Sequence, residues 1–254
     1  QGEKPMKIRI KFRKTGIMKF IGHLDVMRYF QKAIRRADVE ICYSGGFSPH
    51  QIMSFAAPLG VGITSNGEYV DIEVHSTGTT AEMLERLNAV MAEGFEIAEY
   101  KLLPDTAANA MSSVAAADYT LTFRPGYEPE EESAEEWFKK LTAFFDQPQV
   151  MVLKKTKKGE KEMDLKPLIY DLGVIAGNDA AQSQLFMKIS TGSASNIKPE
   201  LLLDAYYEAL GKERSPFAFM VQREEVYADQ ASEHEREQGI HSFIPLGALG
   251  QDIE

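Results

Sequence analysis

Residues 21–60 read IGHLDVMRYFQKAIRRADVEICYSGGFSPHQIMSFAAPLG, and this stretch decides the first half of the fold. Apolar residues recur at helical spacing over residues 23–37, while the opposite face is basic. A strand candidate at residues 39–43 follows, and the chain then turns at Gly45 and Gly46. A helix followed by a strand and a glycine turn predicts the beginning of an α+β domain.

The segments on either side of this stretch complete the domain. Residues 7–12 (KIRIKF) and 68–74 alternate between apolar and polar side chains, which predicts half-buried strands. Thr79 and Glu82 match a capping box at the start of a second helix, and residues 95–102 read as a further strand. The resulting order, β-α-β-β-α-β, is the ferredoxin-like split βαβ pattern.

The second half of the chain repeats this order. A strand at residues 118–123, a helix at 133–145 and a lysine-rich hairpin at 150–165 precede a strand at 185–190. A helix from Pro199 and a strand at 217–226 complete the repeat. The sequence therefore predicts an α+β fold of two tandem ferredoxin-like domains, divided into a first domain at 6–103, a linker at 104–117, a second domain at 118–228 and a polar, loosely held tail at 229–254.

Composition narrows the class of protein. The chain has 254 residues with 44% hydrophobic and 26% charged side chains, near the averages of globular proteins. No apolar run approaches the roughly 18 residues of a membrane span. The single Cys42 excludes an internal disulfide and an iron–sulfur cluster, and it fits a reducing compartment. These features predict a cytoplasmic protein without membrane contact, and no spacing of ligands predicts a metal ion or another cofactor.

Charge is distributed unevenly along the chain. The net charge is −10, but the first 50 residues hold 11 Lys or Arg and 4 Asp or Glu. Their local net charge is +7, and that of the remaining residues is −17. This asymmetry indicates a polarised molecule with one anion-attracting face. The alternative is that the acidic surface maintains solubility and that the basic N-terminal segment binds no ligand.

Two groups of residues are candidates for binding an anionic ligand. The first is basic, and its side chains could contact phosphates, although a solvated helix face has the same pattern. It consists of Arg13, Lys14, Arg28, Lys32, Arg35 and Arg36. The second surrounds the glycine turn and offers hydroxyl, imidazole and aromatic groups, although it also fits an ordinary turn. It consists of Tyr43, Ser44, Phe47, Ser48 and His50.

His23 and His50 are the candidates for acid–base chemistry, because the ordinary pKa of histidine lies near neutrality. Both are also common polar contacts, so no catalytic residue is assigned. Lys154, Lys155, Lys157, Lys158 and Lys161 crowd the predicted hairpin. They suit either a second ligand contact or a charged tip that discourages edge pairing of strands.

The motifs G-H-L-D, R-R-A, Y-S-x-G-F-S-P-H, S-F-A-x-P-L-G and G-E-Y-V-D-I lie between Arg13 and Glu73. In these motifs the chain resembles the radical SAM-linked protein family, a bacterial domain of unknown function. The second half fits more loosely, through D-L-K-P-L at residues 164–168. Because the family occurs fused to or beside radical SAM proteins, the resemblance implies a radical SAM protein as partner. More distantly, tandem ferredoxin-like units are similar to RNA-processing proteins of CRISPR systems and to some pseudouridine synthases.

Three functions remain open from the sequence. The first is an accessory protein that binds RNA, such as tRNA or rRNA, for a radical SAM partner. The second is an RNA-processing or base-modifying enzyme that uses His50 or His23. The third is a protein-interaction subunit whose acidic second domain docks the partner without contact to nucleic acid.

Overall fold

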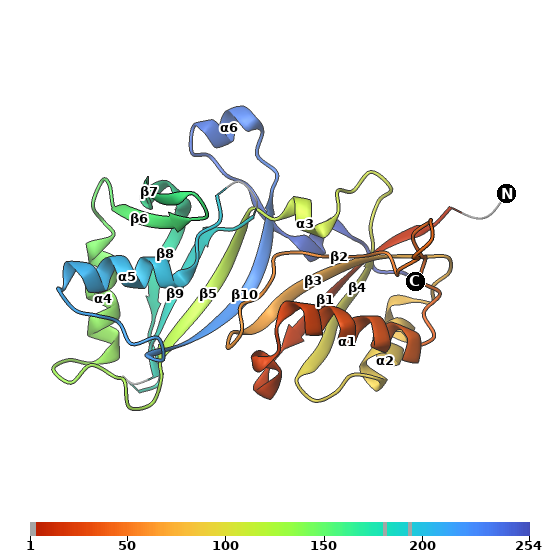
Figure 1. Ribbon diagram of the computed structural model, residues 1–254, viewed down its shortest axis with the longest axis horizontal. Helices are drawn as coiled ribbons and strands as arrows, with labels where there is room; N and C mark the ends of the chain where they lie inside the picture. The colour runs from red at the N-terminus through yellow and green to blue at the C-terminus, as the bar shows by residue number, and fades with distance from the viewer. Residues whose placement is uncertain (1–3, 180–181, 193–194) are drawn as a thin grey trace. The chain divides into compact units, whose positions relative to one another are not determined.

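The computed structural model describes residues 4–179, 182–192 and 195–254, and the chain divides into two compact units. Unit 1 comprises Gln1–Ala115 and Arg223–Glu254, and unit 2 comprises Ala116–Gln222. The division falls within strand β10 (Phe219–Asp229). Both units combine helices with strands, so the α+β class predicted from the sequence is confirmed (Figure 1).

Unit 1 contains an antiparallel sheet with two helices on one face (Figure 1). Strand β1 (Met6–Lys14) lies between β3 (Thr64–Val74) and β4 (Phe95–Leu102), and the short strand β2 (Met53–Phe55) pairs with β3. In the register of β1 and β3, Ile8 lies opposite Ile72 and Ile10 opposite Val70. The elements are β1 (Met6–Lys14), η1 (Gly16–Phe20), α1 (His23–Arg36), β2 (Met53–Phe55), β3 (Thr64–Val74), α2 (Thr80–Ala89) and β4 (Phe95–Leu102).

The core of unit 1 forms between the apolar side chains that alternate along β1 and the apolar side chains at helical spacing on α1. Ile8, Ile10 and Phe12 all point from β1 toward the helices, and each is at most 2% exposed. Phe30 of α1 packs on Phe12 with ring centroids 4.5 Å apart. The predicted capping box at the start of α2 is confirmed, because the Thr79 side chain and the Glu82 backbone and side chain make both of its hydrogen bonds.

The second strand of unit 1 begins later than the sequence predicts. Residues 39–43 form only isolated bridges, of Ile41 with Val74 and of Tyr43 with Gln51. Regular pairing with β3 is confined to β2 (Met53–Phe55). The glycine turn interrupts the ladder, since Gly46 takes a positive φ of 96° and the chain around it is exposed.

The C-terminal tail corrects a second expectation, because it packs on unit 1 rather than lying loosely. Strand β11 (Phe243–Pro245) pairs with the end of β10, and the following turn η4 (Leu246–Leu249) buries Leu246 completely. The predicted linker likewise contains a short helix, α3 (Ala110–Ser113). An Arg9 guanidinium nitrogen donates to the Leu246 carbonyl at 3.0 Å, so the tail covers a residue that strand alternation places at the surface. A short apolar segment and backbone hydrogen bonds hold a tail whose overall composition is polar.

Asp229 binds the segment of the tail that leads from β10 back to β11. Its carboxylate accepts hydrogen bonds from the backbone N–H groups of Ala231 and Ser242, both at 2.9 Å, and lies 2.8 Å from Nδ1 of His241. Burial opposes the charged form of Asp229, but His241 and the two N–H groups outweigh it and lower the pKa of this carboxyl.

We expect Asp229→Asn to lose about 1–2 kcal/mol of stability at neutral pH. The folded-state pKa lies below the unfolded value of about 3.9, so the unfolded chain binds more protons in acid. The stabilisation by the charged Asp229 carboxylate is therefore complete above the pKa of the unfolded chain. It is lost as the pH falls through the lower pKa of the folded protein. Urea denaturation of both proteins between pH 7 and pH 2 should show the difference vanish at the acid end. A constant difference would contradict this role of the charge.

Unit 2 has an antiparallel sheet in the order β5-β9-β8 and a separate hairpin. Trp137 of α4 (Ala134–Phe144) contacts Tyr206 of α5 (Pro199–Ala209) with ring centroids 5.0 Å apart, so the two helices of unit 2 pack together. The predicted hairpin is confirmed, whereas strand β8 was not predicted because Asp171 and Gly173 interrupt its apolar pattern. The elements are β5 (Ala116–Phe123), α4 (Ala134–Phe144), β6 (Met151–Thr156), β7 (Gly159–Asp164), β8 (Ile169–Ile175), β9 (Gln184–Ser190) and α5 (Pro199–Ala209).

Candidate ligand-binding site

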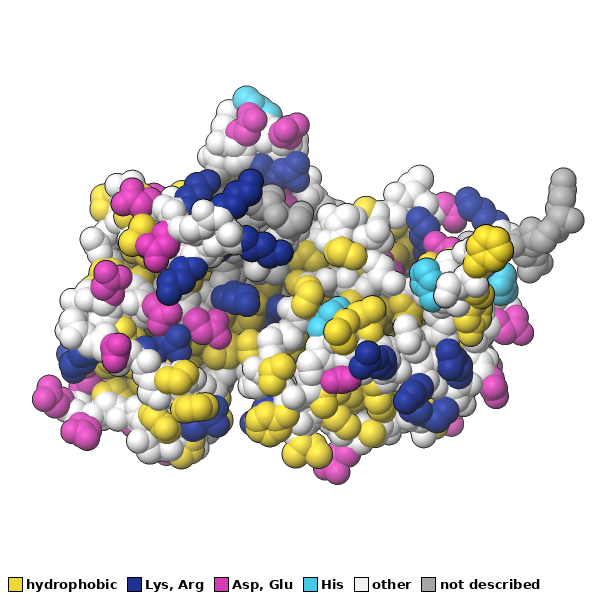
Figure 2. All heavy atoms as spheres, in the orientation of Figure 1, with side chains coloured by type: hydrophobic (Ala, Val, Ile, Leu, Met, Phe, Trp, Pro, Cys, Tyr) yellow, Lys and Arg dark blue, Asp and Glu magenta, His cyan; other side chains and the backbone are white. Residues whose placement is uncertain are grey.

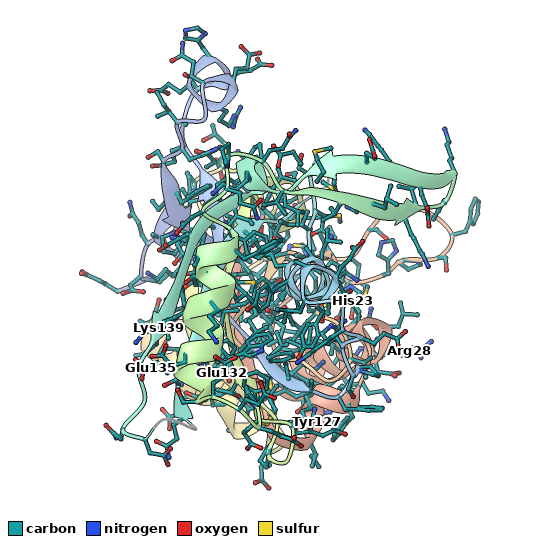
Figure 3. All side chains as sticks on the ribbon, turned by 90° about the vertical axis from the view of Figure 1, so that its left-hand side faces the viewer. His23, Arg28, Tyr127, Glu132, Glu135 and Lys139 are labelled. Atoms are coloured by element: carbon teal, nitrogen blue, oxygen red, sulfur yellow. The ribbon has the colours of Figure 1, made fainter. Side chains whose placement is uncertain are left out.

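The basic face of α1 lies at the surface, as Figure 2 shows for the Lys and Arg side chains gathered over this helix. The opposite face carries the buried residues Val26, Phe30, Ala33 and Ile34, and helical geometry then directs the cations outward. His23 is the first residue of α1 and Arg28 lies in its N-terminal half, and both are labelled in Figure 3. The exposed cations are Arg28, Lys32, Arg35 and Arg36.

Two of these cations are already engaged within unit 1. Arg28 lies 3.3 Å from the Asp25 carboxylate, and both side chains are exposed, so the pair contributes little to stability. Arg36 donates to the Val90 carbonyl at 3.2 Å. Across the residues that the structure describes, no acidic side chain forms an ion pair with Lys32 or Arg35. These two cations are therefore free for a ligand.

Hydrogen bonds between Ser44 and His50 join the two ends of the loop at residues 44–50. The Ser44 hydroxyl lies 2.9 Å from Nδ1 of His50 and accepts the His50 backbone N–H at 3.1 Å. Because Nδ1 is engaged, Nε2 is the ring nitrogen left for a ligand. Ser48 is exposed, Tyr43 is half exposed, and Phe47 is fully exposed. A fully exposed phenyl ring offers a face on which an aromatic group can stack.

The base of this loop is attached to α1. Gln51, which follows His50, is buried and donates from its side chain to the Gln31 carbonyl in the middle of α1 at 3.2 Å. This hydrogen bond holds the end of the loop beside the helix, and the Ser44 N–H, which donates to the His50 carbonyl at 2.8 Å, holds the start of the loop to its end. The loop and the basic face of α1 therefore belong to one surface of unit 1.

The basic N-terminal segment does not form a basic face as a whole. Arg9 pairs with Asp71 at 2.8 Å, Lys11 pairs with Glu225 at 2.6 Å, and Arg13 pairs with Glu96 at 3.2 Å. Acidic residues from distant parts of the sequence thus neutralise the cations of β1. Of the residues predicted to bind, Arg13 is exposed and paired, and Lys14 lies apart in a cavity.

That cavity has a volume of about 20 Å³, enough for one or two water molecules. It lies between β1, β3 and the first turn of α1, and the half-buried His23 and Ala57 form its rim. The structure thereby brings together Lys14 and His23, which the sequence proposes separately. The lining residues are Phe12, Lys14, His23, Val26, Phe55, Ala57, Leu59, Glu68 and Tyr69.

Glu68 is the acidic residue of this cavity, and it is not among the site residues predicted from the sequence. Its carboxylate accepts from the Ser65 hydroxyl at 2.7 Å and from the Arg223 guanidinium at 3.2 Å. Burial raises the pKa of Glu68, and Arg223, Ser65 and Lys14 oppose that effect. Burial lowers the pKa of Lys14, with Glu68 opposing. Burial and then the positive charge of Lys14 lower the pKa of His23, which keeps its imidazole neutral near pH 7.

The signal for this cavity was present in the strand pattern. Ile8, Ile10 and Phe12 alternate toward the core, and Lys14 is the next residue in that series. Glu68 occupies the corresponding place before Val70, Ile72 and Val74 in β3. A lysine and a glutamate that continue the apolar faces of paired strands mark a buried polar site.

Among the described residues, no group of three or more His, Cys, Asp or Glu side chains is placed to hold a metal ion, and no helix is long and apolar enough to cross a membrane.

The known proteins that the chain matches include a solved structure and a family model. No curated protein matches the chain. A solved structure titled as a Cbf5-Nop10-Gar1 complex has a chain that matches with 9% identity and a TM-score of 0.48. The match covers 86% of this chain and 48% of that chain, so this chain spans about half its length.

A family model described as an uncharacterized protein conserved in bacteria (DUF2344) matches residues 7–199. The matched segment includes all of α1, the loop at residues 44–50 and the cavity residues from Phe12 to Tyr69. It therefore contains most of the candidate site and well over half of the sequence. The chain belongs to this DUF2344 family of bacterial proteins.

Proposed function

We propose that the protein is an accessory subunit that binds RNA through α1 and the loop at residues 44–50, for a radical SAM partner. The observation that carries the proposal is the pair of exposed cations, Lys32 and Arg35, on a helix that also fixes the loop. Cations on one helix face bind backbone phosphates, and the exposed ring of Phe47 suits stacking on a base. The radical SAM partner follows from the sequence resemblance.

The proposal includes a ferredoxin-like fold for both units. In unit 1, the antiparallel pairing of β4 with β1, of β1 with β3 and of β3 with β2 supports it, as do the positions of α1 and α2 between strands along the chain. In unit 2, the order β5-β9-β8 supports the same arrangement with the β6-β7 hairpin as an insertion.

We expect the double variant Lys32→Glu/Arg35→Glu to bind RNA at least tenfold more weakly near 0.1 M salt. Fluorescence anisotropy with labelled single-stranded RNA and with tRNA, measured over a salt series, is the test. For single strands, the slope of log K against log salt should become shallower by about 1.4, or about 0.7 for each lost phosphate contact. Because both side chains are exposed, thermal unfolding should change little.

The matched control is Lys157→Glu/Lys158→Glu, which makes the same charge change on the exposed tip of the hairpin. Unchanged affinity in this control would assign binding to α1. An equal loss in both variants would reflect net charge or a second contact at the hairpin. If the wild-type protein binds neither RNA at low salt, the proposed function is wrong.

A further inference from the structure

The cavity beside the first turn of α1 contains a buried cation to which the described residues offer one hydrogen-bond acceptor. The Lys14 side chain is 1% exposed, and its ammonium donates to the Ile21 carbonyl at 2.8 Å. An ammonium has three N–H donors. Among the described residues, no carboxylate lies within 4.0 Å of Lys14, because the Glu68 carboxylate is turned to Arg223 and Ser65. A buried charge without a close counterion is costly.

Two further groups at this cavity favour a negative charge. His23 is the first residue of α1, and its ring is held edge-on against Phe55 at 5.5 Å. A neutral imidazole can donate one N–H to an anion at the rim. Gly22, the residue before the helix, has no side chain to cap the first backbone N–H groups, and a helix N-terminus carries a partial positive charge.

We infer that this cavity is a subsite for an oxyanion, the phosphate or carboxylate group of a ligand. One oxygen enters beside the Lys14 ammonium, and the rest of the ligand remains outside His23 and Ala57. The volume of about 20 Å³ fits one or two oxygen atoms but not a whole phosphate, so the cavity recognises the end of a larger molecule. Glu68 orients the site while Arg223 offsets its charge. The inference does not depend on RNA binding, since Lys32 and Arg35 do not line this cavity.

The test is a titration of the full chain with sodium phosphate and with sodium acetate at constant ionic strength, with chloride as the reference. We expect the thermal midpoint to rise by about 3 °C at ten times the dissociation constant, and then with the logarithm of the anion concentration. The His23 ring resonances report occupancy of the site and should shift along a saturation curve with the same dissociation constant. Phosphate also stabilises proteins generally by exclusion from their surface, but that effect produces no saturable shift of the His23 resonances.

Lys14→Met should abolish the saturable shift of the His23 resonances and leave only the general rise of the thermal midpoint in phosphate, because it keeps the length of the side chain and removes the ammonium. Lys212→Met, on the exposed surface of unit 2, is the matched control and should respond as the wild type does. If Lys14→Met does not fold, His23→Leu, which has no hydrogen-bond donor, provides the test through the thermal midpoint, with an expected loss of about tenfold in affinity for a hydrogen bond to a charged group. No saturable response to either anion in the wild type, or an unchanged response in the variant that folds, would overturn the inference.

A competition experiment separates the two sources of the oxyanion. If phosphate displaces labelled RNA from the wild type more strongly than from Lys14→Met, the subsite holds an RNA phosphate. If both proteins release RNA equally while the saturable phosphate response persists, the subsite serves a separate small ligand. Loss of RNA binding with a retained phosphate response would refute the proposed function and leave the subsite standing.

Discussion

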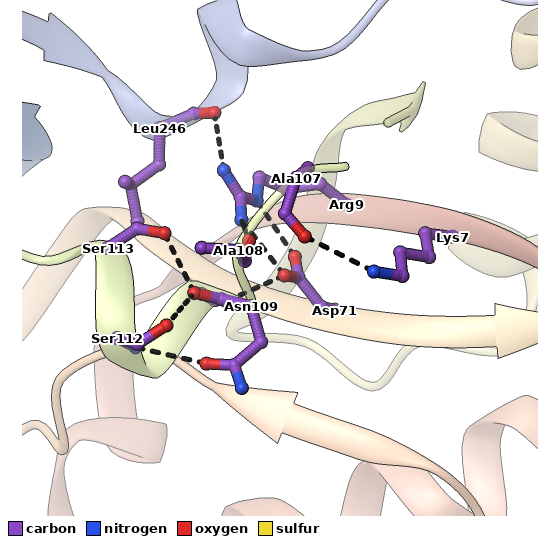
Figure 4. Close-up of polar contacts among 10 residues, drawn as sticks. Lys7, Arg9, Asp71, Ala107, Ala108, Asn109, Ser112, Ser113 and Leu246 are labelled. Carbon is purple, nitrogen blue, oxygen red and sulfur yellow. Dashed lines mark hydrogen bonds and ion pairs between the residues drawn. The ribbon is translucent and has the colours of Figure 1, made fainter. Parts of the chain in front are cut away.

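Replacing Asp71 with alanine is expected to lower the free energy of unfolding by about 3–5 kcal/mol, because it leaves the Arg9 charge buried without its counterion. The Asp71 carboxylate accepts from Nε and Nη2 of Arg9 at 2.8 and 2.9 Å (Figure 4). It also accepts from the Ala110 N–H at 2.7 Å. Arg9 also donates to the carbonyls of Leu246 and Ala108, so the pair joins β1 and β3 to the linker and the tail.

Chemical denaturation at neutral pH measures this loss. A matched control is Arg9→Met/Asp71→Leu, in which the whole ion pair is replaced by apolar groups and most of the stability should return. Limited proteolysis gives a second measurement, since Asp71→Ala should expose the tail after Asp229 to cleavage earlier than the wild type does. A loss below about 1 kcal/mol would mean that the pair is open to solvent and that other contacts hold the tail.

The sequence predicted the parts of unit 1 in which local pattern and burial agree. The alternation of Ile8, Ile10 and Phe12 and the helical spacing of Val26 and Phe30 depend only on near neighbours. The capping box before α2 also involves residues three apart. Such elements can be identified without knowledge of the partners, because one face of each must be buried against something.

The electrostatic part of the prediction depended on distant partners and was less successful. The first 50 residues carry a net charge of +7, but Asp71, Glu96 and Glu225 neutralise three of their cations across separations of 62, 83 and 214 residues. A sum of charges along a segment cannot show which of them meet an opposite charge in space. The basic surface that remains is on α1, where the side chains of Lys32 and Arg35 are exposed.

Glu68→Ala is the second change for which a large effect is expected, again about 3–5 kcal/mol of unfolding free energy. The Arg223 side chain is 5% exposed and would keep its hydrogen bonds to the carbonyls of Ala57 and Pro58, at 3.0 and 3.4 Å, but would lose the carboxylate that offsets its charge. Lys14 would lose the nearest negative charge at the same time. Glu68→Gln is the milder comparison, because its amide oxygen can still accept from Ser65 or Arg223 while the charge is removed.

Lys14→Met should act in the opposite direction at the same cavity. In chloride buffer, it removes a buried ammonium that has no close counterion, so stability should be unchanged or should rise. Urea denaturation of Glu68→Ala, Lys14→Met and the double variant forms a cycle that measures the coupling of the two residues. Weak coupling would mean that Glu68 serves Arg223 and that Lys14 is available for an external anion. If Lys14→Met costs as much as Glu68→Ala, Glu68 is already the counterion of Lys14, and the cavity has no charge left to offer a ligand.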